Sequence, residues 1–412
     1  MKTRTRVLVV LGVVAAALPV VAVTHRGAPR RRGALLAAAP SVAPGGARRA
    51  GSPEIQGVVA GLNPAAARPG PDGRFVAALP DGRTARLTLE PEWQRATAAL
   101  LARHAMPQAS VVVLDTDTGR VLVWASRGAG GRDLARDAEA PAASVFKIVT
   151  GSALLAHGMQ PDETTCFSGG FHRLMPADLT PDPRRDRECV TLGEAFARSI
   201  NTVFARRALA HLRPDLEAEA ARRWGFGAEL PFDAPVARSV YLIPEDTLGF
   251  ARTAAGFWNT SLSPLHGALL AQGVALRGEM RRPWIVESIR GARNEELAHG
   301  TAHPWRRATS PEVAAVLQRA MLRTVTDGTG FHGFHDPAGR LYLDGVTVGG
   351  KTGTLTQDAP YVAYTWFVGN AEGEGRRLSF GVMVGNGPTW RVKAATLARQ
   401  VLQIAFRGQP TD

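Results

Sequence analysis

The chain has 412 residues, of which 45% are hydrophobic and 21% charged, so neither disorder nor a coiled coil accounts for most of it. The formal net charge is +13, but residues 1–50 hold nine basic side chains and no acidic one, which leaves 40 basic against 36 acidic residues in the remainder. Because the basic excess belongs to one tail, and no arginine-rich stretch interleaved with aromatic residues follows it, we expect no nucleic-acid partner.

The first 24 residues are typical of a targeting segment. Lys2, Arg4 and Arg6 precede an uncharged and mostly apolar run over residues 7–23. This run is slightly long for a cleaved signal core and short for a membrane span, so residues 1–24 are interpreted as a signal anchor or a signal peptide. Positive charge before the run keeps the N-terminus in the cytoplasm. We therefore expect a protein of the cell envelope, anchored in the inner membrane, with its main domain in the periplasm or otherwise outside that membrane.

Three further parts follow along the chain. Residues 25–54 are rich in Ala, Gly, Pro and Arg and lack apolar periodicity, which predicts a flexible linker. Residues 55–90 form a short N-terminal segment that ends in a predicted strand at 85–89. An amphipathic helix is predicted over 91–104, because proline favours the first helical position. Residues 91–412 are expected to form the main domain.

The strand signals lie at the two ends of this domain. Two β-branched runs, 109–115 and 120–126, are joined by Thr-Asp-Thr-Gly and predict a hairpin. The predicted C-terminal strands and closing helix cover 346–352, 361–371, 378–385 and 390–406. Because residues 144–322 show mostly helical patterns, we predict a mixed α/β fold, with a mostly antiparallel central sheet flanked by helices and a large helical insertion.

The first candidate site lies on an apolar helix predicted over 141–158. Ser144 lies at its start, and Lys147 is three residues further on the same face. The start of a helix offers free N–H groups and a positive dipole end, which suit a developing oxyanion. A serine hydroxyl needs a base, and lysine can serve when burial or a nearby cation lowers its pKa from about 10.4 toward neutrality.

Lysine is rare in this chain. Only four of the 49 basic residues are lysines, and the other 45 are arginines. The lysines are Lys2, Lys147, Lys351 and Lys393. Arginine does not give up its proton, so a lysine inside an apolar helix favours Ser144 as nucleophile and Lys147 as base. The alternative is a helix-capping serine beside a lysine that reaches out to solvent.

Two further motifs are weak when taken alone. Ser199-Ile-Asn201 is also explained as a cap or turn. The segment 349–354 reads Gly-Gly-Lys-Thr-Gly-Thr inside a predicted strand, where glycines indicate either a close ligand approach or a bulged edge. Its candidate binding residues are Lys351, Thr352, Gly353 and Thr354. Strand N–H groups, two hydroxyls and one ammonium suit a carboxylate and a carbonyl.

The cysteines and histidines give weaker evidence for a functional site. Cys166 and Cys189 are the two cysteines, and in an exported chain they can form a disulfide or remain as two buried thiols. His332 and His335 are the most suggestive histidine pair, but they lack a Glu or Cys companion at ligand spacing. We therefore expect neither a metal nor a cofactor.

The order Ser-x-x-Lys, Ser-x-Asn, Lys-Thr-Gly resembles the signature of penicillin-recognising serine enzymes, whose fold serine β-lactamases share. Over roughly 85–406 the chain resembles the monofunctional (class B) penicillin-binding transpeptidases. The segments that carry this likeness are 87–94, 110–115 with Gly119, 263–266, Gly278, Arg282-Pro283, 328–330 and 366–369. Cys166 and Cys189 fall where some of these transpeptidases carry paired cysteines.

The resemblance implies roles for the candidate residues. Ser144 would attack the penultimate D-alanine carbonyl of a peptidoglycan stem peptide, or a β-lactam, while Lys147 takes its proton. Ser199 would relay a proton to the leaving amine, and Asn201 would hold Lys147 and the substrate amide. The terminal carboxylate would bind Lys351, Thr352 and Thr354, and the N–H groups of Ser144 and Thr354 would form the oxyanion hole. A cell-wall synthesis complex and the cytoplasmic membrane are the further partners expected.

Two departures and three alternatives accompany this resemblance. Residues 55–90 are short for the usual N-terminal pedestal, and the segment 126–140 before the nucleophile is also short.

The alternatives are other functions of the same fold. A serine β-lactamase needs a group that activates water, which the sequence does not identify. A D,D-carboxypeptidase would transfer the acyl group to water, and a penicillin sensor or envelope scaffold would be catalytically silent.

Overall fold

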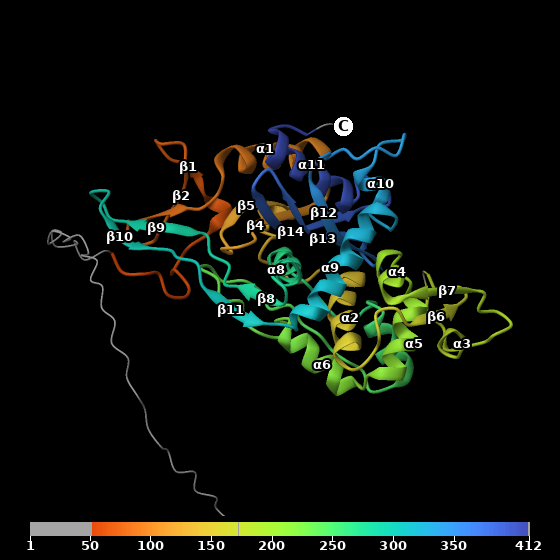
Figure 1. Ribbon diagram of the computed structural model, residues 1–412. Helices are drawn as coiled ribbons and strands as arrows, with labels where there is room; N and C mark the ends of the chain where they lie inside the picture. Colours follow the sequence, from red (N-terminus) through yellow and green to blue (C-terminus); the bar gives the residue numbers. More distant parts are fainter. Residues whose placement is uncertain (1–51, 172, 411–412) are drawn as a thin grey trace, which may run out of the picture. The chain divides into compact units, whose positions relative to one another are not determined.

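The computed structural model describes residues 52–171 and 173–410 (Figure 1). The predicted signal segment at 1–24 and nearly all of the predicted linker at 25–54 lie outside the described residues. Within the described ranges, no helix combines the length and apolar character that crossing a membrane requires.

The central sheet has five antiparallel strands in the order β12-β13-β14-β4-β5. The predicted hairpin is confirmed as β4 (Gln108–Asp115) and β5 (Val121–Arg127). The three predicted C-terminal strands are confirmed as β12 (Thr347–Asp358), β13 (Tyr361–Gly373) and β14 (Arg376–Asn386), each longer than predicted. The mostly antiparallel central sheet is therefore confirmed, and β12 is one of its edges.

Helices cover both faces of this sheet because successive side chains of a strand point to opposite faces, and strands such as β4 and β14 are buried on both. In β4, Val111 packs in a core cluster with α1 (Pro91–His104) and α11 (Ala394–Arg407), which lie side by side in Figure 1. Val112 points to the other face and joins the cluster that contains α8 (Pro264–Ala275). The helix predicted over 91–104 is confirmed, whereas the closing helix begins later than the predicted residue 390.

The region between the two strand groups is largely helical. Its other α-helices are α2 (Lys147–Ala156), α3 (Pro176–Leu179), α4 (Leu192–Ala197), α5 (Asn201–His211), α6 (Pro214–Arg223), α7 (Thr247–Ala254), α9 (Pro311–Thr326) and α10 (Phe331–Phe334). Short 3-10 helices are η1 (Pro64–Ala66), η2 (Ala129–Gly131) and η3 (Ala143–Phe146). Helix α2 contacts α4, α5, α6 and α9, which explains why it is apolar on nearly all sides.

A second five-stranded sheet is absent from the sequence-based prediction. Its order is β1-β2-β3-β9-β10, and two separate ribbons pair β8 with β11 and β6 with β7. These strands are β1 (Arg68–Pro69), β2 (Phe75–Ala78), β3 (Thr84–Leu87), β6 (Thr164–Phe167), β7 (Glu188–Thr191), β8 (Glu279–Arg281), β9 (Val286–Arg290), β10 (Glu296–His299) and β11 (Pro304–Arg307). Each has at most five residues, which is too short for a clear alternating pattern. Through β3 and β9, the N-terminal segment pairs with residues that lie within the region between the two strand groups.

Candidate active site

Ser144 lies in η3, which runs directly into α2. The predicted single helix over 141–158 is therefore divided into a 3-10 turn and an α-helix. Ala143 has a φ of 49°, a left-handed conformation that is uncommon for a residue with a Cβ. Gly256 supports this turn from outside, since a Cβ there would lie 2.6 Å from Ala143 O and 2.8 Å from Ser144 Cα. The backbone at Ser144 is thus held by a close contact with Gly256.

The amine of Lys147 is fully buried beside Ser144. Its Nζ lies 2.9 Å from Ser144 Oγ and 2.7 Å from Asn201 Oδ1, and it also donates to Ala255 O. The ring of Phe204 lies 5.3 Å away. No carboxylate among the described residues forms a salt bridge with this amine, so every acceptor around it is neutral.

Burial is the main cause that lowers the pKa of Lys147 well below its ordinary value, and the nearby Lys351 lowers it further. A neutral amine has two N–H donors and one lone pair. When Asn201 Oδ1 and Ala255 O accept the two N–H groups, the lone pair faces Ser144 Oγ. This arrangement can accept the proton of the Ser144 hydroxyl.

Ser199 and Asn201 lie where α4 ends and α5 begins. Ser199 has a φ of 58°, and its Oγ accepts a hydrogen bond from Lys351 Nζ at 3.0 Å. Asn201 is the first residue of α5, and its Nδ2 donates to Phe171 O at 2.8 Å. This contact orients the Asn201 amide so that its oxygen points to Lys147. The structure thus brings both residues of the second motif to Ser144.

Strand β12 supplies the third motif along its free edge. Lys351 is fully buried, its Nζ also donates to Thr352 O at 2.9 Å, and burial lowers its pKa from 10.5 to about 7. Thr354 is exposed. A Cβ at Gly353 would lie 3.3 Å from Ala142 O, which explains why glycine stands where the strand passes the turn of Ser144.

The cleft between these elements has a volume of about 930 Å³. Six of the eight predicted residues line it, namely Ser144, Ser199, Asn201, Thr352, Gly353 and Thr354. Lys147 and Lys351 are buried behind them. Lys393 lies at the rim, 5.6 Å from the ring of Trp390, so every lysine in the described part of the chain is at this cleft.

Several contributors to the site escape the sequence-based reasoning. The carbonyl oxygens of Ala255 and Phe171 accept from Lys147 and Asn201, but backbone acceptors leave no signal in side-chain identity. Thr329, whose hydroxyl lies 2.5 Å from that of Thr352, belongs to the Gly-Thr-Gly stretch that carries part of the resemblance. The rarity of lysine could have identified Lys393.

The remaining candidates lie elsewhere. Cys166 and Cys189 are opposite each other in the ribbon of β6 and β7, where they form a disulfide with an S–S distance of 1.92 Å. His335 stacks on the ring of Phe331 at 3.9 Å, and His332 meets the same ring edge-on. Among the described residues, no three or more His, Cys, Asp or Glu side chains are grouped to hold a metal ion.

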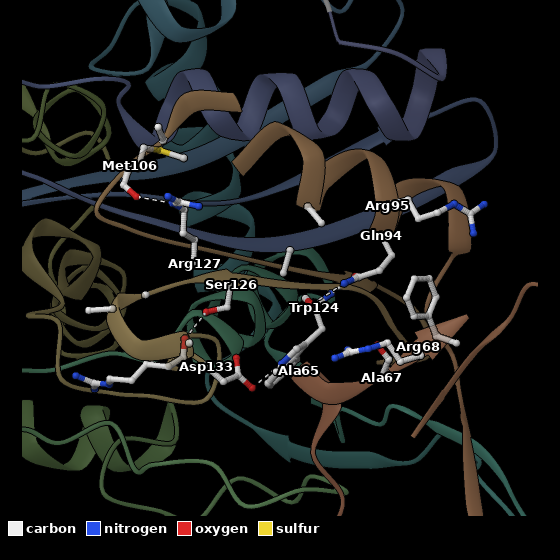
Figure 2. Close-up of a pocket in the computed structure, with 18 of the residues that line it drawn as sticks. Ala65, Ala67, Arg68, Gln94, Arg95, Met106, Trp124, Ser126, Arg127 and Asp133 are labelled. Carbon is white, nitrogen blue, oxygen red and sulfur yellow. Dashed lines mark hydrogen bonds between the residues drawn. The ribbon is translucent and has the colours of Figure 1, made fainter. Parts of the chain in front are cut away.

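A second cavity of about 840 Å³ lies between η1, α1 and β5 (Figure 2). The side-chain amide of Gln94 bonds both the N–H and the C=O of Trp124 at 2.8 Å, and so covers part of the free edge of β5. The Trp124 indole donates to Asp133 at 2.9 Å. None of the predicted site residues lines this cavity, so the candidate active site is the cleft at β12.

The chain is similar to a mycobacterial protein both in sequence and in fold. The curated "Peptidoglycan D,D-transpeptidase PbpA" of Mycobacterium tuberculosis is 28% identical over 285 residues, covering 66% of this chain and 56% of that protein. The chain therefore spans little more than half the length of this relative. The crystal structure of PBPA from M. tuberculosis has a TM-score of 0.66 at 24% identity, covering 79% of this chain and 83% of that one.

A second structure of this mycobacterial protein is described as an imipenem acyl-enzyme complex. It has a TM-score of 0.65 at 24% identity and covers 79% of this chain and 80% of that one. These likenesses confirm the mixed α/β fold. The family model "Penicillin binding protein transpeptidase domain" matches residues 109–403, more than two thirds of the chain. The chain therefore belongs to the penicillin-binding protein transpeptidase family.

Proposed function

We propose that this protein is a peptidoglycan D,D-transpeptidase whose Ser144 is acylated by stem peptides ending in D-Ala-D-Ala and by β-lactams. The observation that carries the proposal is the amine of Lys147, fully buried among neutral acceptors and 2.9 Å from Ser144 Oγ. A neutral amine at this distance is a base for the serine hydroxyl. The mycobacterial relative that carries the name D,D-transpeptidase supports the same reaction.

Acylation requires two proton transfers, the first from Ser144 to Lys147 and the second to the leaving amine. Ser144 Oγ bonds to the carbonyl carbon of the penultimate D-alanine, and its proton passes to Lys147 Nζ. The C–N bond then breaks, and the amine of the terminal D-alanine leaves with a proton relayed by the Ser199 hydroxyl. Asn201 keeps Lys147 in place, since its Oδ1 lies 2.7 Å from Nζ.

Strand β12 would bind the end of the substrate. Its terminal carboxylate would meet the hydroxyls of Thr352 and Thr354, with Lys351 supplying positive charge behind them. The backbone N–H groups of Ser144 and Thr354 would stabilise the oxyanion, and losing one such donor typically costs about 2.7–4 kcal/mol. Gly353 lets the strand approach the nucleophile closely enough for this.

The fate of the acyl group separates a transpeptidase from a β-lactamase. Rapid hydrolysis needs a group near Ser144 that activates water. Asp358 is the one carboxylate among the described residues that line the cleft, and it lies four residues beyond Thr354, about 13 Å along an extended strand. This separation favours a long-lived acyl-enzyme that an amine of a second stem peptide resolves.

The setting of the reaction is part of the proposal. The apolar run at 7–23 would direct the chain to the cytoplasmic membrane and place the domain at 91–412 outside it. Stem peptides in the cell wall are then the natural substrates, and a cell-wall synthesis complex is the expected protein partner.

The test combines a labelled penicillin with a stem-pentapeptide muropeptide. We expect stable label on the full chain, none on Ser144→Ala, and unchanged labelling of Ser126→Ala, a control whose serine lines the other cavity. Mass analysis should then find cross-linked dimers. Tetrapeptide monomers alone would indicate a carboxypeptidase, rapid loss of label would indicate a β-lactamase, and no label would contradict the acylation proposal.

A further inference from the structure

Helix α6 places a carboxyl group behind the candidate active site. Glu217 is fully buried, and its Oε1 lies 2.6 Å from Thr150 Oγ1 on α2. Its other oxygen, Oε2, has no hydrogen-bond partner among the described residues. A buried ionised carboxylate left with one neutral contact is unfavourable, so this group favours its protonated form.

A count of protons leads to the same protonated form. The Thr150 hydroxyl has one hydrogen, yet it lies within hydrogen-bond distance of two oxygens, Glu217 Oε1 and Ala254 O, the latter at 2.9 Å. An ionised Glu217 and a carbonyl are both acceptors only, so they would compete for that hydrogen. A protonated Glu217 donates to Thr150, which is then free to donate to Ala254 O. Both contacts are satisfied only in the second case.

The turn that follows α7 connects this chain of bonds to the nucleophile. Ala254 O accepts from Thr150, and the next residue, Ala255, accepts from Lys147 through its own carbonyl. The residue after that, Gly256, packs against the backbone of Ser144. Three consecutive residues therefore contact Thr150, Lys147 and Ser144 in turn.

We propose that Glu217, in its protonated form, is a positioning residue that fixes the Ala254–Gly256 turn through Thr150 and so holds the amine of Lys147 against Ser144. The inference rests on the proposed role of Lys147 as base. It assigns no contact with substrate to Glu217, which contacts Thr150, three residues beyond Lys147 on α2, and does not line the cleft. Loss of its proton would release Ala254 O and loosen the turn.

The pH range of this effect follows from the surroundings of the carboxyl group. Burial raises the pKa of Glu217 to about 7, against a smaller opposing contribution from Thr150. The charged and titratable groups on the elements around it are Lys147 on α2 and His157 directly after it, Arg206, Arg207 and His211 on α5, Arg252 on α7, and Asp215, Glu219, Arg222 and Arg223 on α6 itself. None of these described groups forms a hydrogen bond or ion pair with the Glu217 carboxyl. Its ionisation above about pH 7 should therefore reduce acylation on the alkaline side.

The experiment measures the second-order rate of Ser144 acylation by a labelled penicillin between pH 6 and 9 in the full chain. We expect the wild-type rate to fall roughly fivefold on the alkaline side beyond any loss of the penicillin itself. Glu217→Gln keeps an N–H donor for Thr150 at every pH, so its alkaline fall should be smaller than that of wild type by this factor. The fall that remains is the loss of positive charge at Lys351, whose pKa is about 7 and which both proteins share. Glu217→Ala should be slow throughout, and Glu219→Gln, which changes a partly exposed residue on the same helix, should match wild type.

Two outcomes would contradict the positioning role of Glu217 and leave the proposed transpeptidase function unaffected. One is a Glu217→Gln profile with the same alkaline fall as wild type. The other is wild-type acylation by both Glu217→Ala and Thr150→Val, each shown to be folded by its circular dichroism and thermal midpoint. Thr150→Ser should restore the rate, since it keeps the relaying hydroxyl. If wild-type Ser144 takes no label at all, the proposed function fails instead.

Discussion

Among the described residues, two of the regions that bury positive charge surround it differently. Beside the second sheet, Arg282 donates to Asp233 Oδ1 at 2.6 Å, and the other oxygen of Asp233 accepts from the N–H groups of Ile285 and Val286. In the cleft, Lys147 and Lys351 are buried still more completely, but their hydrogen-bond partners are hydroxyl, amide and carbonyl oxygens.

The difference explains why one region is structural and the other suited to chemistry. A carboxylate stabilises the charged form of Arg282, which never needs to give up its proton. The cleft offers no carboxylate to its two buried amines within the described residues, so burial favours their neutral forms. Arginine is thus used where charge must persist, and lysine is used at position 147, where the amine must be able to take up and give up a proton.

The largest expected effect comes from Lys147→Arg. The guanidinium keeps a positive charge but cannot act as a base at neutral pH. Acylation of Ser144 by a labelled penicillin should fall by roughly 10²–10⁴-fold, the range for general base catalysis. The reciprocal change, Arg282→Lys, should lower the thermal midpoint and leave acylation of the folded protein near wild type. Efficient acylation of Ser144 in Lys147→Arg would show that a side chain that keeps its proton can replace the lysine. The proposed difference between the buried arginine and the buried lysine would then be wrong.

The next effect is a pH dependence of stability that Lys351 contributes. Its pKa is about 7 in the folded protein and 10.5 ordinarily, so between these values the unfolded chain binds more protons. Stability therefore rises with pH over this window, because the cost of burying the amine is full below about pH 7 and disappears above about 10.5. Lys351→Met should lose this contribution.

The measurement is urea unfolding of both proteins at pH 7 and pH 10. The advantage of Lys351→Met over wild type should shrink by an amount on the order of 4 kcal/mol between these pH values. Lys393→Met provides a control, because Lys393 is exposed at the rim of the same cleft. A constant difference between Lys351→Met and wild type would show that Lys351 stays charged when buried.

The smallest effect tests the structural region. Asp233→Asn leaves Arg282 buried without a counter-charge and weakens two backbone contacts, so it should cost about 3 kcal/mol of unfolding free energy. Glu229→Gln removes the partner of Arg238 from an exposed pair and should change stability by less than about 0.5 kcal/mol. Labelling of Ser144 in folded Asp233→Asn should match wild type, and a large loss of labelling would mean that this region also shapes the cleft.

Sequence patterns predict the central sheet and the residues that gather at the β12 cleft for physical reasons. The strands β12, β13 and β14 are long, β-branched and buried, so their signal survives without knowledge of the fold. The rarity of lysine singled out Lys147, because a composition that strongly prefers arginine makes each exception informative. The same argument applied to Lys393 would have extended the site to the rim of the cleft.

What the sequence does not reveal depends on contacts between distant segments. Ala255 and Phe171 act through backbone oxygens, which any residue type provides. Glu217 looks like an ordinary residue of an acidic helix start, and only its burial behind α2 makes it unusual. Of the second sheet, only β3 (Thr84–Leu87) is predicted from the sequence, as the strand at 85–89. Its other strands are too short to be recognised before their partners are known.

Pairing between β3 and β9 also constrains how the chain can fold. Leu87 is opposite Val286, roughly 200 residues later in the sequence. At synthesis rates of about 5–20 residues per second, the first strand waits roughly 10–40 s for its partner to be made. Until then its edge is open, so the N-terminal strands depend on protection against premature association, and a shortened protein that began after β3 would leave β9 with that open edge permanently.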